Sequence, residues 1–272
     1  MIPAPFEYVA AGSPAEAVEL LRRYGEDAKL LAGGHSLLPM MKVRLAAPAV
    51  LVDIGSIGSL SYVRVLDGEL AIGAATTHQA VASSPLVRSQ VPLLARSAGL
   101  VGDPQVRHRG TIGGSLAHAD PAADLPMALS AVDGRVVVLG PSGTREIGVE
   151  EFFVGYFETA LAPDELIVEV RMPVRPGQPW GYQKFTRRAN DWAIVGVATV
   201  GGRVALATMG PVPVRALATE RALAAGATAT EAAALAADGT DPTDDIHADA
   251  AYRRHLARVL TRRALVTAAT PA

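Results

Sequence analysis

Ala32-Gly33-Gly34-His35-Ser36 and Thr111-Ile112-Gly113-Gly114-Ser115 are the two segments that decide the fold of this chain. Each glycine pair follows an apolar, strand-like stretch and is flanked by small or hydroxyl side chains. Glycine adopts positive φ freely and has no Cβ, so a phosphate group can approach its backbone amides closely. Two such loops that converge on one ligand would hold both phosphates of a dinucleotide. The sequence therefore predicts a flavin or nicotinamide site.

A glycine pair alone is a weak indication of a ligand loop, because glycine serves many kinds of turn. Gly201-Gly202, between two strand-like runs, is expected to be only a tight hairpin turn. Neither of the first two segments fits the Gly-x-Gly-x-x-Gly pattern of Rossmann folds, and neither continues into Gly-Lys-Ser/Thr of nucleotide triphosphatases. The pattern therefore favours a flavin fold of a different type, in which two separate loops bind one dinucleotide.

The composition narrows the class of protein. The chain has 272 residues, half of them hydrophobic, which is enough for one large domain or two to three small ones. Without cysteine it carries no disulfide, thiolate zinc site or iron–sulfur cluster of its own. A net charge of −2 argues against nucleic acid, and no window reaches the roughly 20 apolar residues of a membrane span. We expect a cytoplasmic protein with no integral membrane segment.

Residues 1–56 are expected to form a small β-α-β unit. Ser13 is a candidate N-cap and Pro14 suits the first position of a helix that ends at Tyr24. Lys29–Ala32 is predicted to be a strand that leads into the first glycine pair. Val50–Ile54 is a second strand, whose continuous apolar character is typical of a strand covered on both faces.

Short strands, turns and two helices are predicted between residues 57 and 176. The strands are Tyr62–Val65, Leu70–Ile72, Arg135–Leu139 and Leu166–Met172, and the helices are Leu93–Leu100 and Pro126–Ser130. Pro173–Pro179, with three prolines and one glycine, is a natural linker, so we expect domains at 1–176 and 177–272.

The region beyond the linker is predicted to begin with three strands and to end in helices. The strands are Trp180–Phe185, Ala193–Val200 and Val204–Met209. Alanine-rich helical spacing starts at Leu217, breaks near Gly239, and resumes in an arginine-rich helix at Ala250–Val266.

Several polar residues outside the glycine pairs are candidates for chemistry. His118, Asp120 and Asp124 lack a second nearby histidine, so a metal site is not expected, and Asp124 is a candidate to contact the cofactor or to cap a helix. Arg107-His108-Arg109 is equally compatible with an anion clamp and a solvated turn. Lys184 and Trp192 are further candidates, since a tryptophan beside a polar stretch can cover an aromatic ring, although tryptophan more often lies in a core.

Hydrolytic chemistry is not indicated. Ser36 and Ser115 lack the Gly-x-Ser-x-Gly pattern of a nucleophile, and no pair of carboxylates is placed for glycosidic chemistry. A flavin protein needs only to orient its cofactor and tune its electrostatics, so we expect no catalytic residue on this chain.

The chain resembles a known family in four places, namely Leu31–Lys42, Asp103–Arg107, Thr111–Gly114 and Asp120–Asp124. It is similar over its whole length to the flavin-binding medium subunit of molybdenum hydroxylases, which include aerobic carbon monoxide dehydrogenase and bacterial xanthine dehydrogenase relatives. The resemblance implies an α+β protein with a two-subdomain FAD-binding fold of the vanillyl-alcohol-oxidase type, the subdomains being about 1–56 and 57–176. A C-terminal three-stranded antiparallel sheet with a helical bundle would follow.

The resemblance also implies which residues bind FAD. The pyrophosphate would lie against both glycine segments, which comprise Ala32, Gly33, Gly34, His35, Ser36, Thr111, Ile112, Gly113, Gly114 and Ser115. Asp124 matches an acidic contact on the adenosine side, and Lys184 falls about one residue from a lysine near the flavin. Trp192 stands where the carbon monoxide enzymes have a tyrosine beside the flavin. That replacement, with Ser115 and His118 in place of asparagines, weakens the assignment to carbon monoxide.

The family assembles as a complex, usually a dimer of heterotrimers. The molybdenum cofactor would lie on a large subunit and two iron–sulfur clusters of the 2Fe-2S type on a small one, with FAD on this chain passing electrons to NAD, a quinone or oxygen. A free-standing flavin oxidase of the same fold is the alternative, and a scaffold without cofactor is disfavoured by the two glycine segments. The sequence indicates neither substrate nor electron acceptor.

Overall fold

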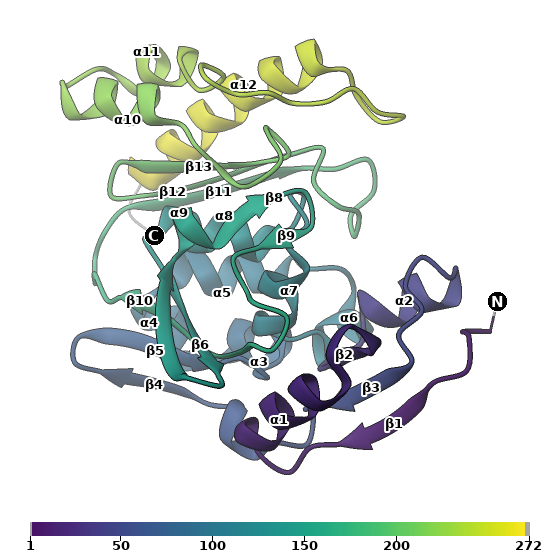
Figure 1. The fold of residues 1–272 in the computed structure, drawn as a ribbon. Helices are drawn as coiled ribbons and strands as arrows, with labels where there is room; N and C mark the ends of the chain where they lie inside the picture. Colours follow the sequence, from purple (N-terminus) through teal and green to yellow (C-terminus); the bar gives the residue numbers. More distant parts are fainter. Residues whose placement is uncertain (1, 270–272) are drawn as a thin grey trace.

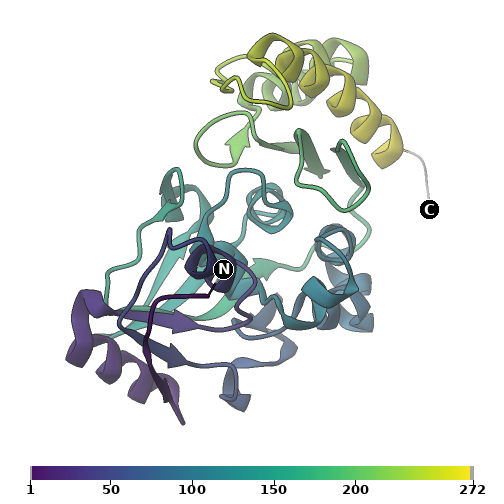
Figure 2. The ribbon, with the colours of Figure 1, turned by 90° about the vertical axis from the view of Figure 1, so that its right-hand side faces the viewer.

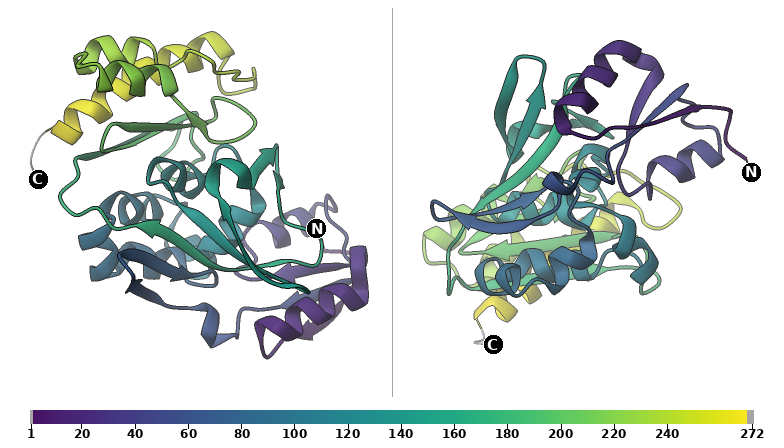
Figure 3. Two further views of the ribbon diagram at one scale, coloured as in Figure 1. Left: turned by 60° about the vertical axis from the view of Figure 1, so that its left-hand side comes forward. Right: turned by 90° about the horizontal axis from the view of Figure 1, so that it is seen from below.

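The computed structural model describes residues 2–269 and has three parts arranged in chain order (Figure 1). Figure 3 shows the N-terminal unit, in purple, at one end of the molecule and the C-terminal sheet and helices, in green to yellow, at the opposite end. A larger layer of helices and an antiparallel sheet lies between them. This mixed α and β architecture agrees with the expected fold class.

The N-terminal unit is a parallel sheet in the order β1 (Glu7–Ala10), β3 (Val50–Asp53), β2 (Ala28–Leu31). The helix α1 (Pro14–Tyr24) connects β1 to β2, and Ser13 caps it by accepting a hydrogen bond from the Glu16 amide. The predicted helix and both predicted strands are therefore present. The strand β1, which completes the β-α-β unit, was not predicted, because it has only four residues and most of them are exposed.

The middle part is an antiparallel sheet with helices against it. Its strand order is β4 (Val63–Leu66), β5 (Glu69–Gly73), β10 (Leu166–Pro173), β6 (Arg135–Gly140), β7 (Gly143–Gly148). The helices are α3 (His78–Ser83), α4 (Pro85–Gln90), α5 (Pro92–Gly99), α6 (Pro104–Arg109), α7 (Ile112–His118), α8 (Asp124–Ala131) and α9 (Val149–Phe152). The short strands β8 (Phe153–Gly155) and β9 (Glu158–Thr159) form a hairpin beside α7. The sequence predicted only α5 and α8 among these helices.

The C-terminal part is a second antiparallel sheet, in the order β11 (Trp180–Phe185), β12 (Val195–Val200), β13 (Arg203–Ala207), β14 (Val214–Arg215). The three predicted strands are all present, and the two-residue strand β14 adds a fourth. One face packs against α5 and α8, and the other carries the last helix, α12 (Ala250–Ala269) (Figure 2). The helices α10 (Leu217–Ala224) and α11 (Ala229–Ala234) complete this outer layer.

Gly181 shows how closely α12 lies on the sheet. A Cβ atom at this position would be 2.1 Å from the carbonyl oxygen of Ala264 on α12, so only glycine allows the helix backbone to touch β11. Within residues 2–269, no helix combines the length and apolar character needed to cross a membrane.

Candidate functional site

The first glycine segment connects β2 to α2 (Leu37–Lys42) and keeps its amides free. Gly34 has a φ of +78°, which turns the chain sharply at the end of the strand. Within residues 2–269, the amide groups of Gly33, Gly34, His35 and Ser36 donate to no acceptor. Consecutive backbone N–H groups in such a turn form a concave donor set for an anion. This segment therefore fits a phosphate group.

The structure brings the two glycine segments together. A Cβ atom on Gly33 would lie 2.1 Å from the carbonyl oxygen of Arg109 and 2.8 Å from Cα of Gly110. The backbone of the first segment thus contacts the residues immediately before Thr111. The first segment therefore lies beside the start of the second.

The second glycine segment has a different local structure from the one expected. It follows the helix α6 rather than a strand, and Thr111 is the N-cap of α7, with its hydroxyl accepting from the Gly114 amide at 3.1 Å. The expectation of a strand before this segment is therefore wrong. The cause is the run Asp103–Arg109, in which Asp103 caps a short helix that begins with Pro104.

The amides of the second segment are already used within the protein. The Ile112 amide donates to the Thr76 carbonyl at 3.0 Å, and the Gly113 amide donates to the Ala74 carbonyl at 2.8 Å. A Cβ on Gly113 would lie 2.6 Å from Cβ of Ala74, so glycine is required for this packing. Toward a ligand, this segment offers the hydroxyl groups of Thr111 and Ser115 rather than free amides.

His78 is a buried residue beside both segments that the sequence did not single out. Its amide donates to the Gly110 carbonyl at 2.9 Å, and a Cβ on Gly110 would lie 2.8 Å from its Nε2. Its Nδ1 is buried and has no partner among the described residues. Burial, together with the nearby charges of His35 and then Arg107, lowers the pKa of His78 to about 4. No spacing or motif marks this histidine in the sequence.

Arg107-His108-Arg109 forms the last turn of α6. The Arg107 guanidinium donates to the carbonyl oxygens of Val101 and Gly102 at 3.1 and 3.0 Å, so it holds the preceding loop. The contribution of this run to the site is the Arg109 carbonyl against which Gly33 packs.

Asp124 and Lys184, which lie far apart in the sequence, form a buried ion pair. Asp124 begins α8 and Lys184 lies on β11, with Nζ 2.8 Å from Oδ2 and both side chains less than a tenth exposed. The Tyr182 hydroxyl donates to the other oxygen of Asp124, and Ser97 Oγ donates to the Asp124 carbonyl at 2.9 Å. Asp124 therefore reaches across to the C-terminal sheet, and its side chain does not cap α8.

Burial shifts the pKa values of the acidic groups in this cluster. It raises the pKa of Asp124, an effect that the positive charge of Lys184 opposes, and it raises the pKa of the Tyr182 hydroxyl. Tyr182 was missed in the sequence, although its position two residues before Lys184 on a strand places both side chains on the same face.

Trp192 lies in the loop between β11 and β12, residues 186–194, and 56% of its surface is exposed. The loop contains a compact turn in which Arg188 Nε is 3.1 Å from the Asp191 carboxylate. In Figure 1 this loop and α2 lie on the same side of the molecule. Trp192 is therefore a surface residue and not part of a core.

His118 ends α7, and its ring lies 5.2 Å from that of Phe157 in the turn between β8 and β9. Burial lowers the pKa of His118 and raises that of Asp120. Among the residues that the structure describes, no group of three or more potential ligands is placed to hold a metal ion.

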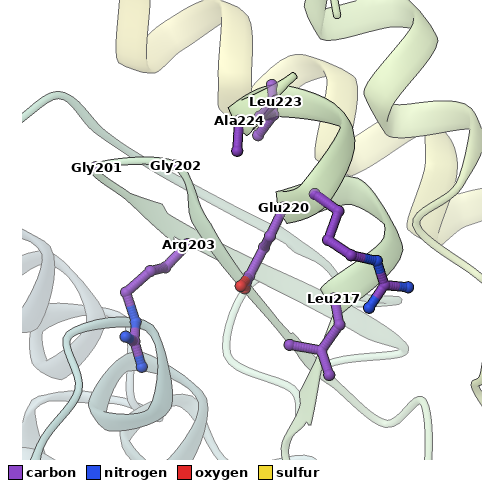
Figure 4. A pocket seen from close by; sticks show the side chains of 8 residues that line it. Gly201, Gly202, Arg203, Leu217, Glu220, Leu223 and Ala224 are labelled. Carbon is purple, nitrogen blue, oxygen red and sulfur yellow. The ribbon is translucent and has the colours of Figure 1, made fainter. Parts of the chain in front are cut away.

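A surface hollow of about 500 Å³ lies elsewhere, between the Gly201-Gly202 turn and α10 (Figure 4). Arg203, Leu217 and Glu220 are among its lining residues, and none of the predicted site residues lines it. Gly201 and Gly202 both have positive φ and join β12 to β13, which confirms the expected hairpin turn. The hollow belongs to the C-terminal part and not to the glycine segments.

Comparisons with known proteins show the family of this chain. Residues 4–175 match the family model described as the FAD binding domain in molybdopterin dehydrogenase, and residues 180–268 match the CO dehydrogenase flavoprotein C-terminal domain. The chain is 43% identical to the carbon monoxide dehydrogenase medium chain of Hydrogenophaga pseudoflava, with 97% of each chain covered. It is 37% identical to the 6-hydroxypseudooxynicotine dehydrogenase complex subunit alpha of Paenarthrobacter nicotinovorans, with coverage of 98% of this chain and 96% of that subunit.

A solved structure shows the same fold throughout. It is a carbon monoxide dehydrogenase from Hydrogenophaga pseudoflava that lacks the molybdenum-pyranopterin moiety of its cofactor. The TM-score is 0.95 at 44% sequence identity, and 98% of each chain is covered. These matches cover nearly the whole chain, and the chain belongs to the family of FAD-binding subunits of molybdopterin dehydrogenases.

Proposed function

We propose that FAD bound to this chain accepts electrons from iron–sulfur clusters on a partner subunit. The FAD then passes them to an external electron acceptor, which is NAD, a quinone or oxygen. The observation that supports this role is the contact of Gly33 with Arg109 and Gly110, which brings the first glycine segment, with four free amides, beside the start of the second. Bound FAD exchanges electrons singly and in pairs, which is chemistry that the side chains of this protein do not supply.

Residues 32–36 and 111–115 would hold the FAD pyrophosphate. The free amides of Gly33, Gly34, His35 and Ser36 would donate to its oxygens, and the hydroxyls of Thr111 and Ser115 would add to them. The rest of the pyrophosphate site would be lined by Ala32, Ile112, Gly113 and Gly114. Their backbones or small side chains would allow the phosphates to approach closely.

Asp124, Lys184 and Trp192 would lie on the flavin side. Because Asp124 and Lys184 are 2.8 Å apart, we propose that both face the same part of FAD, rather than its two distant ends. Lys184 is on β11, which leads directly into the loop that carries Trp192. The exposed Trp192 would then cover the flavin ring.

The partners we propose are a large subunit with the molybdenum cofactor and a small iron–sulfur subunit, assembled as a dimer of heterotrimers in the cytoplasm. Large apolar side chains are exposed on α2 and the chain after it, in the β8–β9 turn and in the β11–β12 loop, as expected of a protein interface. They are Leu38, Val43, Leu45, Tyr156, Phe157 and Trp192. We further propose that residues 1–176 and 177–272 are the two domains of the subunit.

The test is purification of this chain from its host in wild-type form and as Gly33→Ala, Gly114→Ala and Gly58→Ala. A Cβ on Gly33 would meet the Arg109 backbone at 2.1 Å, and overpacking of this kind costs about 1–3 kcal/mol. A Cβ on Gly114 would meet only the Thr111 hydroxyl, at 2.8 Å, and a Cβ on Gly58 would meet nothing within 4 Å. We expect flavin content to fall strongly in the first variant, less in the second and not in the third.

Visible spectra, metal analysis and the co-purifying chains distinguish the possible functions. Flavin and iron–sulfur absorbance with molybdenum and two further chains would support the electron-transfer subunit. Flavin on an isolated chain would support a free-standing oxidase instead. A wild-type complex without flavin, or full flavin content in Gly33→Ala, would contradict the proposed site.

A further inference from the structure

Thr208 has an unusual backbone conformation for its residue type. It follows β13 with a φ of +61°, in the left-handed region that β-branched residues rarely adopt. Such a conformation persists only where the surrounding structure fixes it. The contacts of Thr208 show what that structure is.

Thr208 connects two segments through its amide and its hydroxyl. Its amide donates to the Pro121 carbonyl at 2.9 Å, between α7 and α8. Its Oγ1 lies 2.6 Å from the Ile194 carbonyl and 2.5 Å from the Ala207 carbonyl. Of these two acceptors, Ile194 is the one that lies on a different segment, at the end of the β11–β12 loop.

Arg253 on α12 donates to the same carbonyl. It is only 4% exposed, and its Nη1 donates to the Ile194 carbonyl. Its Nε donates to the Thr243 carbonyl at 3.2 Å, and its Nη2 lies 2.5 Å from Asp245 Oδ2. A buried guanidinium needs such a set of partners, so its position is well defined.

The β11–β12 loop is therefore fixed at both ends. The Ile194 amide donates to the Phe185 carbonyl at 2.8 Å, which closes the loop, and the Tyr252 ring on α12 packs edge-on against the Phe185 ring. Ala193 and Ile194 are buried, whereas Trp192 next to them is exposed. The tryptophan thus projects from a rigid base.

We propose that Thr208 and Arg253 are positioning residues for Trp192, because they clamp the Ile194 carbonyl two residues after it. The inference rests on the proposed function, in which Trp192 covers the flavin. Since the Thr208 amide also holds Pro121, the clamp links the Trp192 loop to the chain that leaves the second glycine segment. The C-terminal sheet and helix then set how the loop meets the cofactor.

The test compares Thr208→Val, which keeps the branched shape and loses the hydroxyl, with Thr208→Ser, which keeps the hydroxyl. The full chain is used in a Trp180→Phe background, in which Trp192 is the single tryptophan. Truncation of the buried Arg253 would leave Asp245 unpaired and risks unfolding, so the threonine pair carries the test. Melting temperatures confirm that each variant is folded.

Two measurements follow. Trypsin cleavage after Arg187 and Arg188 in the FAD-free chain reports loop opening, and loss of one hydrogen bond is expected to accelerate it about tenfold in Thr208→Val. Quenching of Trp192 fluorescence on FAD titration reports the approach of the ring to the flavin. We expect weaker quenching at saturation in Thr208→Val and wild-type behaviour in Thr208→Ser for both measurements.

Three results would overturn the inference. Unchanged cleavage in Thr208→Val would show that the hydroxyl does not hold the loop, and faster cleavage with full quenching would show that the clamp does not position Trp192. FAD that binds without quenching Trp192 in the Trp180→Phe background would remove the role of Trp192 while the proposed function stands. Absence of FAD binding in that background and in the wild type would instead contradict the proposed function itself.

Discussion

His78 illustrates what single residues contribute to the cofactor region. Its ring packs against Gly110, next to the contact between the two glycine segments, and its Nδ1 has no partner among the described residues. The histidine must stay uncharged in the folded state, because burial opposes its protonation. The stability of this region therefore depends on pH through one side chain.

We predict that acid weakens the wild type more than a His78→Gln variant. The pKa of His78 is about 4 in the folded protein against 6.5 in the unfolded chain, so its contribution is complete above pH 6.5 and is lost as the pH falls toward 4. Between pH 7.5 and pH 5 the loss is about 2 kcal/mol. Urea unfolding at both pH values measures it, and an equal loss in both proteins would refute the prediction.

Residue patterns in the sequence predicted the glycine segments but not the contacts around them. The glycines are visible because no other residue combines small size with free φ. His78, Tyr182 and Thr208 act through neighbours that are distant in sequence, such as Gly110, Asp124 and Ile194. No local spacing records these contacts.

At the scale of elements, the ion pair between Asp124 and Lys184 joins α8 to β11, and so joins the middle part of the molecule to the C-terminal sheet. Buried pairs of this kind contribute little net stability, but removal of one partner leaves a buried charge. Loss of either partner is therefore expected to weaken the packing of α8 against β11.

We predict that Lys184→Met destabilises the protein by about 3–5 kcal/mol at pH 7. Because burial raises the pKa of Asp124 above its usual 3.8, protonation restores stability as the pH falls toward that raised value. The double variant Lys184→Met with Asp124→Asn removes the charge and is expected to recover most of the loss at pH 7. Thermal unfolding of the three proteins tests this, and an equally unstable double variant would contradict it.

Elements with long apolar runs were predicted well, and short capped ones were not. Strands β3, β6 and β10 and helix α5 follow their apolar residues closely. Helices such as α3, α6 and α7 have only six or seven residues, too few for a helical period to emerge. Their N-caps, Thr77, Asp103 and Thr111, were the available signals.

For the whole molecule, α8 is the element that makes the two proposed domains depend on each other. Every residue of α8 is buried, and the helix packs between the middle part and the C-terminal sheet. A helix that is buried on all sides needs partners on all sides. The linker after β10 marks a boundary in sequence, but the packing continues across it.

We predict that residues 1–176 expressed alone are less stable than the full chain, because the α8 face that meets β12 and β13 becomes exposed. Co-expression with residues 177–272 is expected to restore solubility and the melting temperature. Circular dichroism melting of both preparations is the measurement. A truncated chain that melts as the full chain does would show that the C-terminal sheet is dispensable for folding.

The arrangement of whole domains is the part that composition and periodicity left open. The sequence predicted most of the longer strands but missed β1, β7, β8, β9 and β14, and the FAD-binding fold came from resemblance to a family. The physical reason is that the C-terminal sheet packs on α5 and α8 through the combined shape of both surfaces. Composition and periodicity do not describe that shape.

The close contact of Gly181 with Ala264 has a consequence for biosynthesis. β11 carries the lysine and tyrosine that hold Asp124, and it packs closely against α12, which comes much later in the chain. During synthesis, the glycine segments leave the ribosome long before α12 does. We expect cofactor insertion to follow synthesis and packing of α12, so a cell that makes this subunit must keep an apo form intact until FAD is loaded.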